Sequence, residues 1–470
     1  MKFKPALLIS AALLLTATPA FSEERAPHEQ KARSLYEEAV AVRTAQGQGK
    51  IPELVDYLVM ELKAGGFTDA DIEVTDYEND GERIQGLMVW YRAEEGKATE
   101  KPIVLLAHMD VVDALPDTWE RYPFDLIEED GYFFGRGTAD NKYGVVSLIS
   151  TFLRLKEEGF KPNRDLVIAL SGDEETGMVS TRAQAKYTAE KIDPAYVLNA
   201  DAGGLTLGMD GTALFYGIQG AEKTYATFEL TVDNPGGHSS APRADNAIYE
   251  LADVLKKIEA YKFPVMHSPL TLASMRISGA QTPGPLGDAM RAFAENPADE
   301  AAIATLRAEP SMVGTIGTTC VATMLRAGHA ENALPQRATA TVNCRIFPGV
   351  GIEATEKTLK EISGNDKLKI KLISDLVESP ESKLPEDVLA AVNVALAERG
   401  LEGITIMPHM SSGGTRLMPG LCCGAQGGAC PFLRTGRAIM PENNRLWRQQ
   451  PAKAGRLTFA HEQDCAHSVP

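Results

Sequence analysis

The sequence predicts an α/β protein, with a mixed sheet that has helices on both faces and a second, α+β region inserted into it. The first observation is three short apolar runs that do not alternate, at Ile103–Ala107, Leu166–Leu170 and Tyr196–Asn199. Such runs are typical of parallel strands buried on both faces. The second is a helical pattern over residues 143–158, which ends before Gly159. This strand–helix–strand order indicates a doubly wound layer.

The N-terminus has the three parts of an export signal. Lys2 and Lys4 precede an apolar stretch at Ala6–Leu15, and Ala20-Phe21-Ser22 forms a small-residue cleavage site. The apolar stretch is about half the length that a membrane-spanning helix needs. We therefore expect residues 1–22 to be removed, the protein to be periplasmic or secreted, and no membrane association after cleavage.

Beyond about Gly220 the pattern changes to alternating segments, Thr224–Val232 and later Ala338–Ile346. Alternation predicts antiparallel strands, and residues 246–261 have helical spacing between them. About 450 mature residues exceed what one core usually serves, which favours a second domain inserted into the first. The predicted boundaries are a first domain at 23–219, an insertion at 220–377, a return to the first domain at 378–415 and a tail at 416–470.

Acidic and histidine side chains follow each of the three predicted buried strands, and one more acid lies in a glycine-rich loop before the helix. These residues are His108, Asp110, Asp140, Asp173, Glu174, Glu175 and Asp201. They should meet, because ligands in open α/β sheets bind beyond the carboxyl ends of the strands. Crowded carboxylates raise one another's pKa unless cations lie among them. A mixed histidine and carboxylate set predicts zinc, with cobalt or manganese as alternatives, and a shared carboxylate predicts two ions.

Four segments carry a family resemblance. They are residues 106–112 (LAHMDVV), 135–142 (GRGTADNK), 171–177 (SGDEETG) and 236–242 (GGHSSAP). Together they resemble the co-catalytic zinc hydrolases that include acetylornithine deacetylase, succinyl-diaminopimelate desuccinylase, aminoacylase and glutamate carboxypeptidase. The resemblance runs from about residue 30 to Thr415. It implies a zinc-exopeptidase-like catalytic domain with an inserted lid and dimerisation domain, and hydrolysis of an amide bond in a small peptide or N-acyl amino acid.

The resemblance also implies a set of metal ligands. His108 and Asp201 would each bind one metal with Asp140 bridging, while Glu175 would bind the other metal. The peptide bond after the bridging residue, Asp140–Asn141, would be cis. The implied cofactor is two zinc ions per chain.

Two further roles follow from the same resemblance. Asp110 would hydrogen-bond His108 and fix its tautomer, as groups behind a metal ligand usually do. Glu174 would be the general base that takes a proton from the water between the two metals.

Residues outside the metal cluster are implied to bind the substrate. His238 would reach the cleft of the opposite subunit in a homodimer and stabilise the oxyanion; otherwise it is a loop histidine. Asn332 and Arg345 would grip the substrate carboxylate, although a surface ion pair would also suit this arginine. Gly414 and Thr415 belong to the late substrate-binding turn.

The family pattern stops at Thr415. Arg416 stands where the family has Asp, and the histidine that completes the second metal site is missing. Residues 416–470 contain seven Lys and Arg against three Asp and Glu, and they hold four of the six cysteines. A shifted reading frame, a divergent tail and a recombined end all explain this change. The second metal site is then incomplete unless His461 replaces the missing ligand.

Composition and site chemistry limit the competing functions. The net charge of −17 argues against a nucleic-acid partner, which needs a basic face. A two-metal phosphatase is compatible with the metal ligands alone, but Glu174 beside a ligand and a carboxylate-gripping arginine argue against it. The alternative from another class is a binding protein, in which the incomplete site has lost catalysis.

Overall fold

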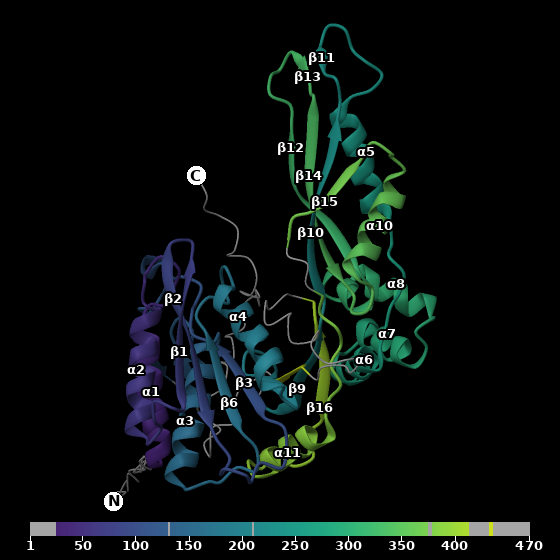
Figure 1. The fold of residues 1–470 in the computed structure, drawn as a ribbon. Helices are drawn as coiled ribbons and strands as arrows, with labels where there is room; N and C mark the ends of the chain where they lie inside the picture. Colours follow the sequence, from purple (N-terminus) through teal and green to yellow (C-terminus); the bar gives the residue numbers. More distant parts are fainter. Residues whose placement is uncertain (1–24, 130–131, 209–210, 375–377, 413–431, 436–470) are drawn as a thin grey trace, which may run out of the picture.

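The computed structural model describes residues 25–129, 132–208, 211–374, 378–412 and 432–435 (Figure 1). The predicted signal peptide, the turn residues Gly414 and Thr415, and His461 in the tail lie outside these residues. Within the described ranges, no helix is both long and apolar enough to cross a bilayer.

Among the described residues, the main sheet has nine strands, and it is mixed. Its order is β1 (Ile72–Asn79), β2 (Glu82–Tyr91), β6 (Leu166–Ser171), β3 (Ile103–His108), β7 (Tyr196–Asn199), β17 (Phe432–Thr435), β9 (Ala213–Glu222) and β16 (Ile406–Ser411), and β8 (Gly204–Leu207) pairs with β9. Strand β3 is parallel to both β6 and β7, as the three apolar runs predict. Strands β1 and β2 form an antiparallel hairpin, and β2 pairs antiparallel with β6.

Helices cover both faces of this sheet. On one face lie α1 (Pro27–Ala41), α2 (Ile51–Ala64) and α3 (Lys142–Glu157), and on the other lies α4 (Val179–Tyr187). Successive strand residues alternate between these faces, so Ile168 packs in the first core and Val167 in the second. Helix α3 ends as predicted, with Gly159 in the left-handed region at φ 69°.

A second sheet of four antiparallel strands follows, in the order β12 (Thr319–Ala327), β14 (Arg337–Ile346), β10 (Thr224–Asp233) and β15 (Lys369–Leu372). The predicted strands β10 and β14 pair along their whole length. Helices α5 (Ala247–Ala260) and α10 (Ile352–Ser363) supply the apolar side chains that pack with this sheet. A disulfide joins Cys320 to Cys344, which lie directly opposite each other on β12 and β14.

A cluster of four helices, which the sequence pattern does not predict, lies beside the edge strand β16 of the main sheet (Figure 1). It comprises α6 (Pro269–Gln281), α7 (Pro285–Glu295), α8 (Glu300–Ala308) and α9 (Pro310–Val313). Its helix α6 contacts β16 of the main sheet, where Ser278 Oγ lies 3.4 Å from Met407 Sδ. On the main sheet, α11 (Glu386–Ala397) packs against β9.

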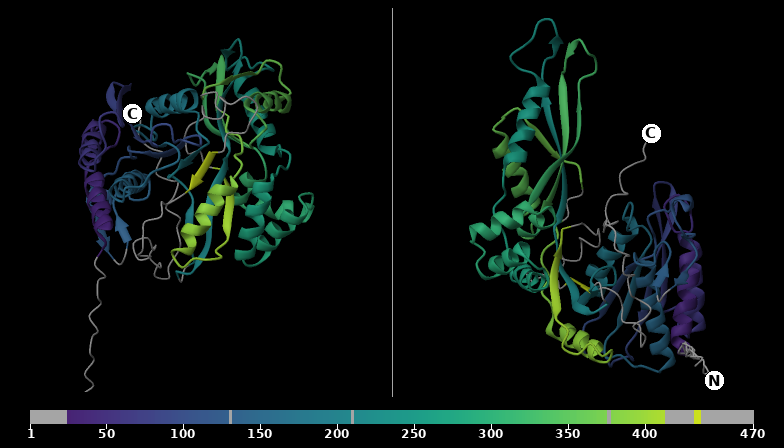
Figure 2. Two further views of the ribbon diagram at one scale, coloured as in Figure 1. Left: turned by 60° about the horizontal axis from the view of Figure 1, so that its bottom comes forward. Right: turned by 180° about the vertical axis from the view of Figure 1, so that it is seen from behind.

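Smaller elements complete the description. They are the hairpin β4 (Ile127–Glu129) and β5 (Tyr132–Phe134), the pair β11 (Gly237–His238) and β13 (Ala333–Leu334), and short helical turns at Pro116–Thr118, Thr188–Ile192 and Gly314–Ile316. The pair β11 and β13 lies at the end of the second sheet that is farther from the main sheet (Figures 1 and 2).

Candidate metal centre

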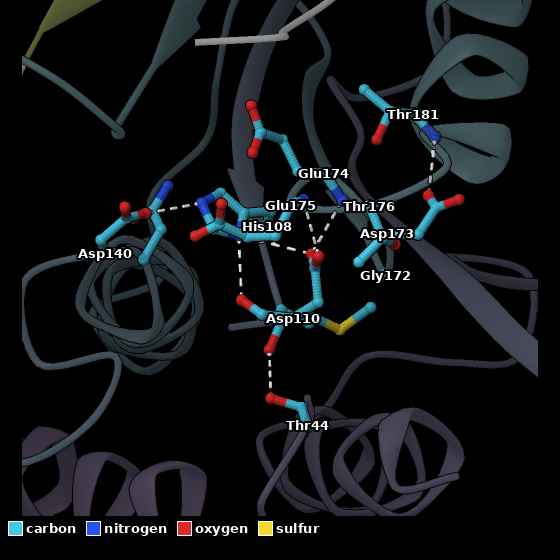
Figure 3. Close-up of polar contacts among 12 residues, drawn as sticks. Thr44, His108, Asp110, Asp140, Gly172, Asp173, Glu174, Glu175, Thr176 and Thr181 are labelled. Atoms are coloured by element: carbon cyan, nitrogen blue, oxygen red, sulfur yellow. Dashed lines mark hydrogen bonds and ion pairs between the residues drawn. The ribbon is translucent and has the colours of Figure 1, made fainter. Parts of the chain in front are cut away.

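The first group of candidate ligands centres on His108, the last residue of β3. Its Nε2 atom lies 2.8 Å from Asp140 Oδ1 and 3.5 Å from Asp201 Oδ1. The three residues each offer a ligand atom within 4.8 Å of the others. The His108 and Asp201 side chains are buried, whereas that of Asp140 is 59% exposed. The fold thus brings together the ends of β3 and β7 and the loop before α3, as the strand-end argument predicts. Figure 3 shows His108 and Asp140 of this group facing each other.

A second group joins the same histidine to the segment after β6. His108, Glu174 and Glu175 also offer ligand atoms within 4.8 Å of one another. Burial, together with neighbouring carboxylates, raises the pKa of Glu174 to about 8 and that of Glu175 to about 7. Glu174 Oε1 is a buried acceptor without a hydrogen-bond partner among the described residues. A buried cluster of carboxylates fits a divalent metal ion, whose charge would offset their desolvation, and the histidine among them fits zinc.

Asp110 connects the two groups. Its carboxylate accepts hydrogen bonds from the main-chain nitrogens of Glu174 at 2.9 Å and Glu175 at 2.8 Å (Figure 3). The Nδ1 atom of His108 lies 3.0 Å from the main-chain oxygen of Asp110 and 3.4 Å from its carboxylate. Burial alone would lower the pKa of His108, but hydrogen bonds to the surrounding aspartates raise it well above its ordinary value. With Nδ1 occupied in this way, Nε2 faces Asp140 and Asp201.

The loop that carries Asp140 leads directly into α3. The peptide bond Asp140–Asn141 is cis, as the family resemblance implies. Asn141 then caps the helix, because its side-chain oxygen accepts a hydrogen bond from Gly144 N at 3.1 Å. The same residue pair therefore presents a carboxylate to the cluster and starts the helix behind it.

Asp173 does not join either ligand group, although the sequence analysis placed it with its two neighbours. Its carboxylate accepts hydrogen bonds from Val179 N, Ser180 N and Ser180 Oγ, at the start of α4. This acid satisfies the free N–H groups of a helix N-terminus. The sequence signal was the polar pair Ser180-Thr181 at the start of that helix.

Lys142 is a buried residue near the site that the sequence analysis did not single out. Its ammonium donates to the main-chain oxygen of Val42, and burial lowers its pKa to about 7. Its stem packs against Gly137, where a Cβ would lie 2.9 Å from Lys142 Cδ. Lys142 therefore supports the loop that carries Asp140. A lysine at the start of an otherwise apolar helix is the signal that could have identified it.

The substrate-binding candidates on the second sheet lie apart from one another. His238 is exposed on β11, with Nδ1 2.7 Å from Ser240 Oγ. Asn332 is its neighbour, because the main-chain oxygen of Asn332 accepts a hydrogen bond from Ser239 N. Arg345 lies near the other end of β14, with its guanidinium 4.7 Å from the Tyr225 ring centre.

The length of β14 separates these candidates. The eight steps along the strand from Arg337 to Arg345 span about 26 Å at the rise of an extended strand. The pair β11 and β13 also lies at the end of the second sheet that is farther from the main sheet (Figure 1). A single chain therefore does not bring His238 and Asn332 to Arg345.

Residues 104–418 match the Peptidase family M20/M25/M40. The chain belongs to this family. It is 29% identical over 332 residues to the N-fatty-acyl-amino acid synthase/hydrolase of Xenopus tropicalis, covering 69% of this chain and 61% of that protein. It is 30% identical over 287 residues to the probable carboxypeptidase S-like 2 of Dictyostelium discoideum, covering 59% of this chain and 54% of that protein.

The solved structures agree with this M20 assignment at the level of the fold. The M20 family metallo-carboxypeptidase Sso-CP2 of Sulfolobus solfataricus superposes with a TM-score of 0.57 at 18% identity, covering 83% of this chain and 88% of that one. The M20 chain described here spans between half and two thirds of the length of its two curated relatives named above.

Proposed function

We propose that this M20 protein is a metal-dependent hydrolase that cleaves an amide bond in small peptides or N-acyl amino acids. The observation that carries the proposal is the buried cluster around His108, where two overlapping ligand groups meet at the carboxyl ends of β3, β6 and β7. The substrate class is supported by the relatives, which are named as an N-fatty-acyl-amino acid synthase/hydrolase and a probable carboxypeptidase.

The proposed ligands are His108, Asp140, Asp201 and Glu175. Bound divalent ions, with zinc as the proposed species, would polarise the scissile carbonyl and lower the pKa of a water molecule. The Asp110 carboxylate accepts hydrogen bonds from the main-chain nitrogens of Glu174 and Glu175, and it thereby positions the backbone that carries these two side chains. The late histidine of the family pattern is absent after Thr415, and we therefore propose that the second ion, at Glu175, is held more weakly than the first.

Glu174 is the proposed general base. The residue is only 5% exposed, and its Oε1 has no hydrogen-bond partner among the residues that the structure describes. This oxygen is therefore available to accept a proton from the attacking water and to return it to the leaving nitrogen. Buried surroundings keep other water away from the same oxygen.

The proposed active unit is a homodimer. Strand β12 forms an edge of the second sheet, and its Val321 and Leu325 are each 62% exposed. An exposed apolar edge strand favours pairing with another chain. A second copy could then supply His238 and Asn332, which lie far from Arg345 within one chain. In that arrangement His238 donates to the developing oxyanion while Arg345 binds the substrate carboxylate.

We also propose that the protein is exported. The sequence of residues 1–22 supports this location, and so does the Cys320–Cys344 disulfide, because such bonds persist in oxidising compartments. The alternative of a non-catalytic binding protein has no support from the comparisons, since the relatives are named as hydrolases and carboxypeptidases.

The proposed function is tested by assaying the mature chain on a panel of dipeptides and N-acyl amino acids. The protein is first treated with a chelator and then titrated with zinc, cobalt or manganese. We expect turnover that disappears with chelator and returns with metal. Metal binding without turnover on any panel member would contradict the hydrolase and support the binding protein.

A further inference from the structure

Lys223 is the single residue between β9 and β10, the strands that connect the main sheet to the second sheet. Its side chain is buried, with 1% of its surface exposed. The ammonium donates to the carbonyl oxygens of Gly314 at 3.0 Å and Gly317 at 2.7 Å, and to Thr319 Oγ1 at 3.3 Å. An ammonium group has three N–H donors, so these acceptors use all of them.

The segment held by Lys223, residues 314–319, lies beside both substrate-binding regions. Thr319 is directly opposite Arg345 in the register of β12 and β14. At the other end, a Cβ on Gly314 would lie 3.6 Å from Ser412 Cβ, at the start of the predicted substrate turn. The main-chain nitrogen of Lys223 also donates to Ser411 O at 3.0 Å.

A buried ammonium at this place is costly. Burial, with a further contribution from the nearby Arg345 charge, lowers the pKa of Lys223 to about 7. An apolar side chain of similar shape would fill the space without that desolvation cost. The three hydrogen bonds of the ammonium therefore indicate that Lys223 holds its acceptors in place. They leave none of its N–H groups free to contact the substrate.

We propose that Lys223 is a positioning residue, which fixes residues 314–319 and so sets the separation between Arg345 and the strand end at Ser411–Ser412. This inference rests on the proposed function, in which Arg345 binds the substrate carboxylate, and on the predicted substrate-binding turn, which Ser411 and Ser412 precede. We expect Lys223 to affect substrate binding and not metal binding, because it lies on the connection between the sheets and outside the two metal-ligand groups.

The test is steady-state kinetics of Lys223→Met on the best substrate of the panel. We expect KM to rise about tenfold or more, as for loss of hydrogen bonds to a charged group, with kcat and zinc content unchanged. Thr319→Val removes one acceptor and should raise KM less, and it serves as the second variant if Lys223→Met fails to fold. Lys371→Met, at an exposed lysine of β15, is the control and should match the wild type.

A double-mutant cycle separates positioning from general stability. If Lys223 acts through Arg345, Lys223→Met should change KM little on an Arg345→Met background. Additive changes in KM, or a lower kcat with unchanged KM in both Lys223→Met and Thr319→Val, would overturn the inference. A wild-type enzyme that hydrolyses no panel member would instead overturn the proposed function, and the inference with it.

Discussion

The two sheets place their candidate functional residues in opposite ways. The main sheet gathers His108 and Asp201, at the ends of buried strands, within 4.8 Å of Asp140 in the loop before α3. The second sheet leaves His238 exposed at one end, and Arg345 lies near the other end of β14. Among the described residues, one chain brings the two metal-ligand groups together, whereas the proposed substrate-binding residues of the second sheet would meet only in the proposed homodimer. Each of the following variants tests one side of this contrast.

The largest effect is expected in the main sheet. Glu174→Gln should lower kcat by about 10²–10⁴-fold, the usual contribution of a general base, while the bound metal stays near the wild-type amount. Kinetics and elemental analysis on the same sample check this. Glu175→Gln is the matched control and should lose metal. Loss of metal in Glu174→Gln would make Glu174 a ligand and contradict the assigned roles.

The tip of the second sheet should come next. His238→Ala should lower kcat by about 10²-fold, as for loss of one oxyanion donor. Metal content and melting temperature should not change, because the side chain is exposed. Ser240→Ala keeps the histidine and removes only its Nδ1 partner, so its effect should be smaller. Full activity of His238→Ala would remove this residue from the reaction.

The exposed edges of the two sheets give a direct comparison. Val321→Glu combined with Leu325→Glu should convert a dimer to a monomer and lower kcat to the level of His238→Ala. Val74→Glu, on the outer strand β1 of the main sheet, is the control and should leave the dimer intact. Light scattering measures the mass. An active monomer in the double variant would show that the site is complete within one chain.

The smallest effect on activity is expected from the disulfide. Replacing both Cys320 and Cys344 by Ser should lower the free energy of unfolding by about 3 kcal/mol. The reason is that the disulfide closes a loop between two residues 24 positions apart and so limits the entropy of the unfolded chain. The value of kcat should stay near that of the wild type. Denaturant unfolding with and without reductant measures the change. A reductant effect that persists in the double variant would point to another disulfide.

Much of the fold could be predicted because local pattern and burial agree. The apolar runs at β3, β6 and β7 and the helical spacing of α3 match the structure within one residue at each end. The alternation of β10 and β14 is equally clear, because each strand has one face on the core. The metal cluster followed, since strand order alone brings His108, Glu175 and Asp201 to one edge.

The remaining features depend on contacts that are distant in sequence. The apolar side chains of helices α6–α9 pack mainly with one another, so these helices do not follow the strand–helix–strand pattern that predicted α3. Asp173 and Glu174 are adjacent, yet only the second faces the cluster, because the start of α4 binds the first. The role of Lys223 could not be predicted from the sequence, because the acceptors of its ammonium, on Gly314, Gly317 and Thr319, are distant in the chain.

The most direct test mixes two inactive subunits. Glu174→Gln and His238→Ala chains, unfolded and refolded together in equal amounts, should form heterodimers as about half of all dimers, for a symmetric pair. One site in each heterodimer then has an intact Glu174 from one chain and an intact His238 from the other. We predict recovery of about a quarter of wild-type activity. No recovery above the sum of the two separate variants, with heterodimers verified by mass, would contradict the cross-subunit site.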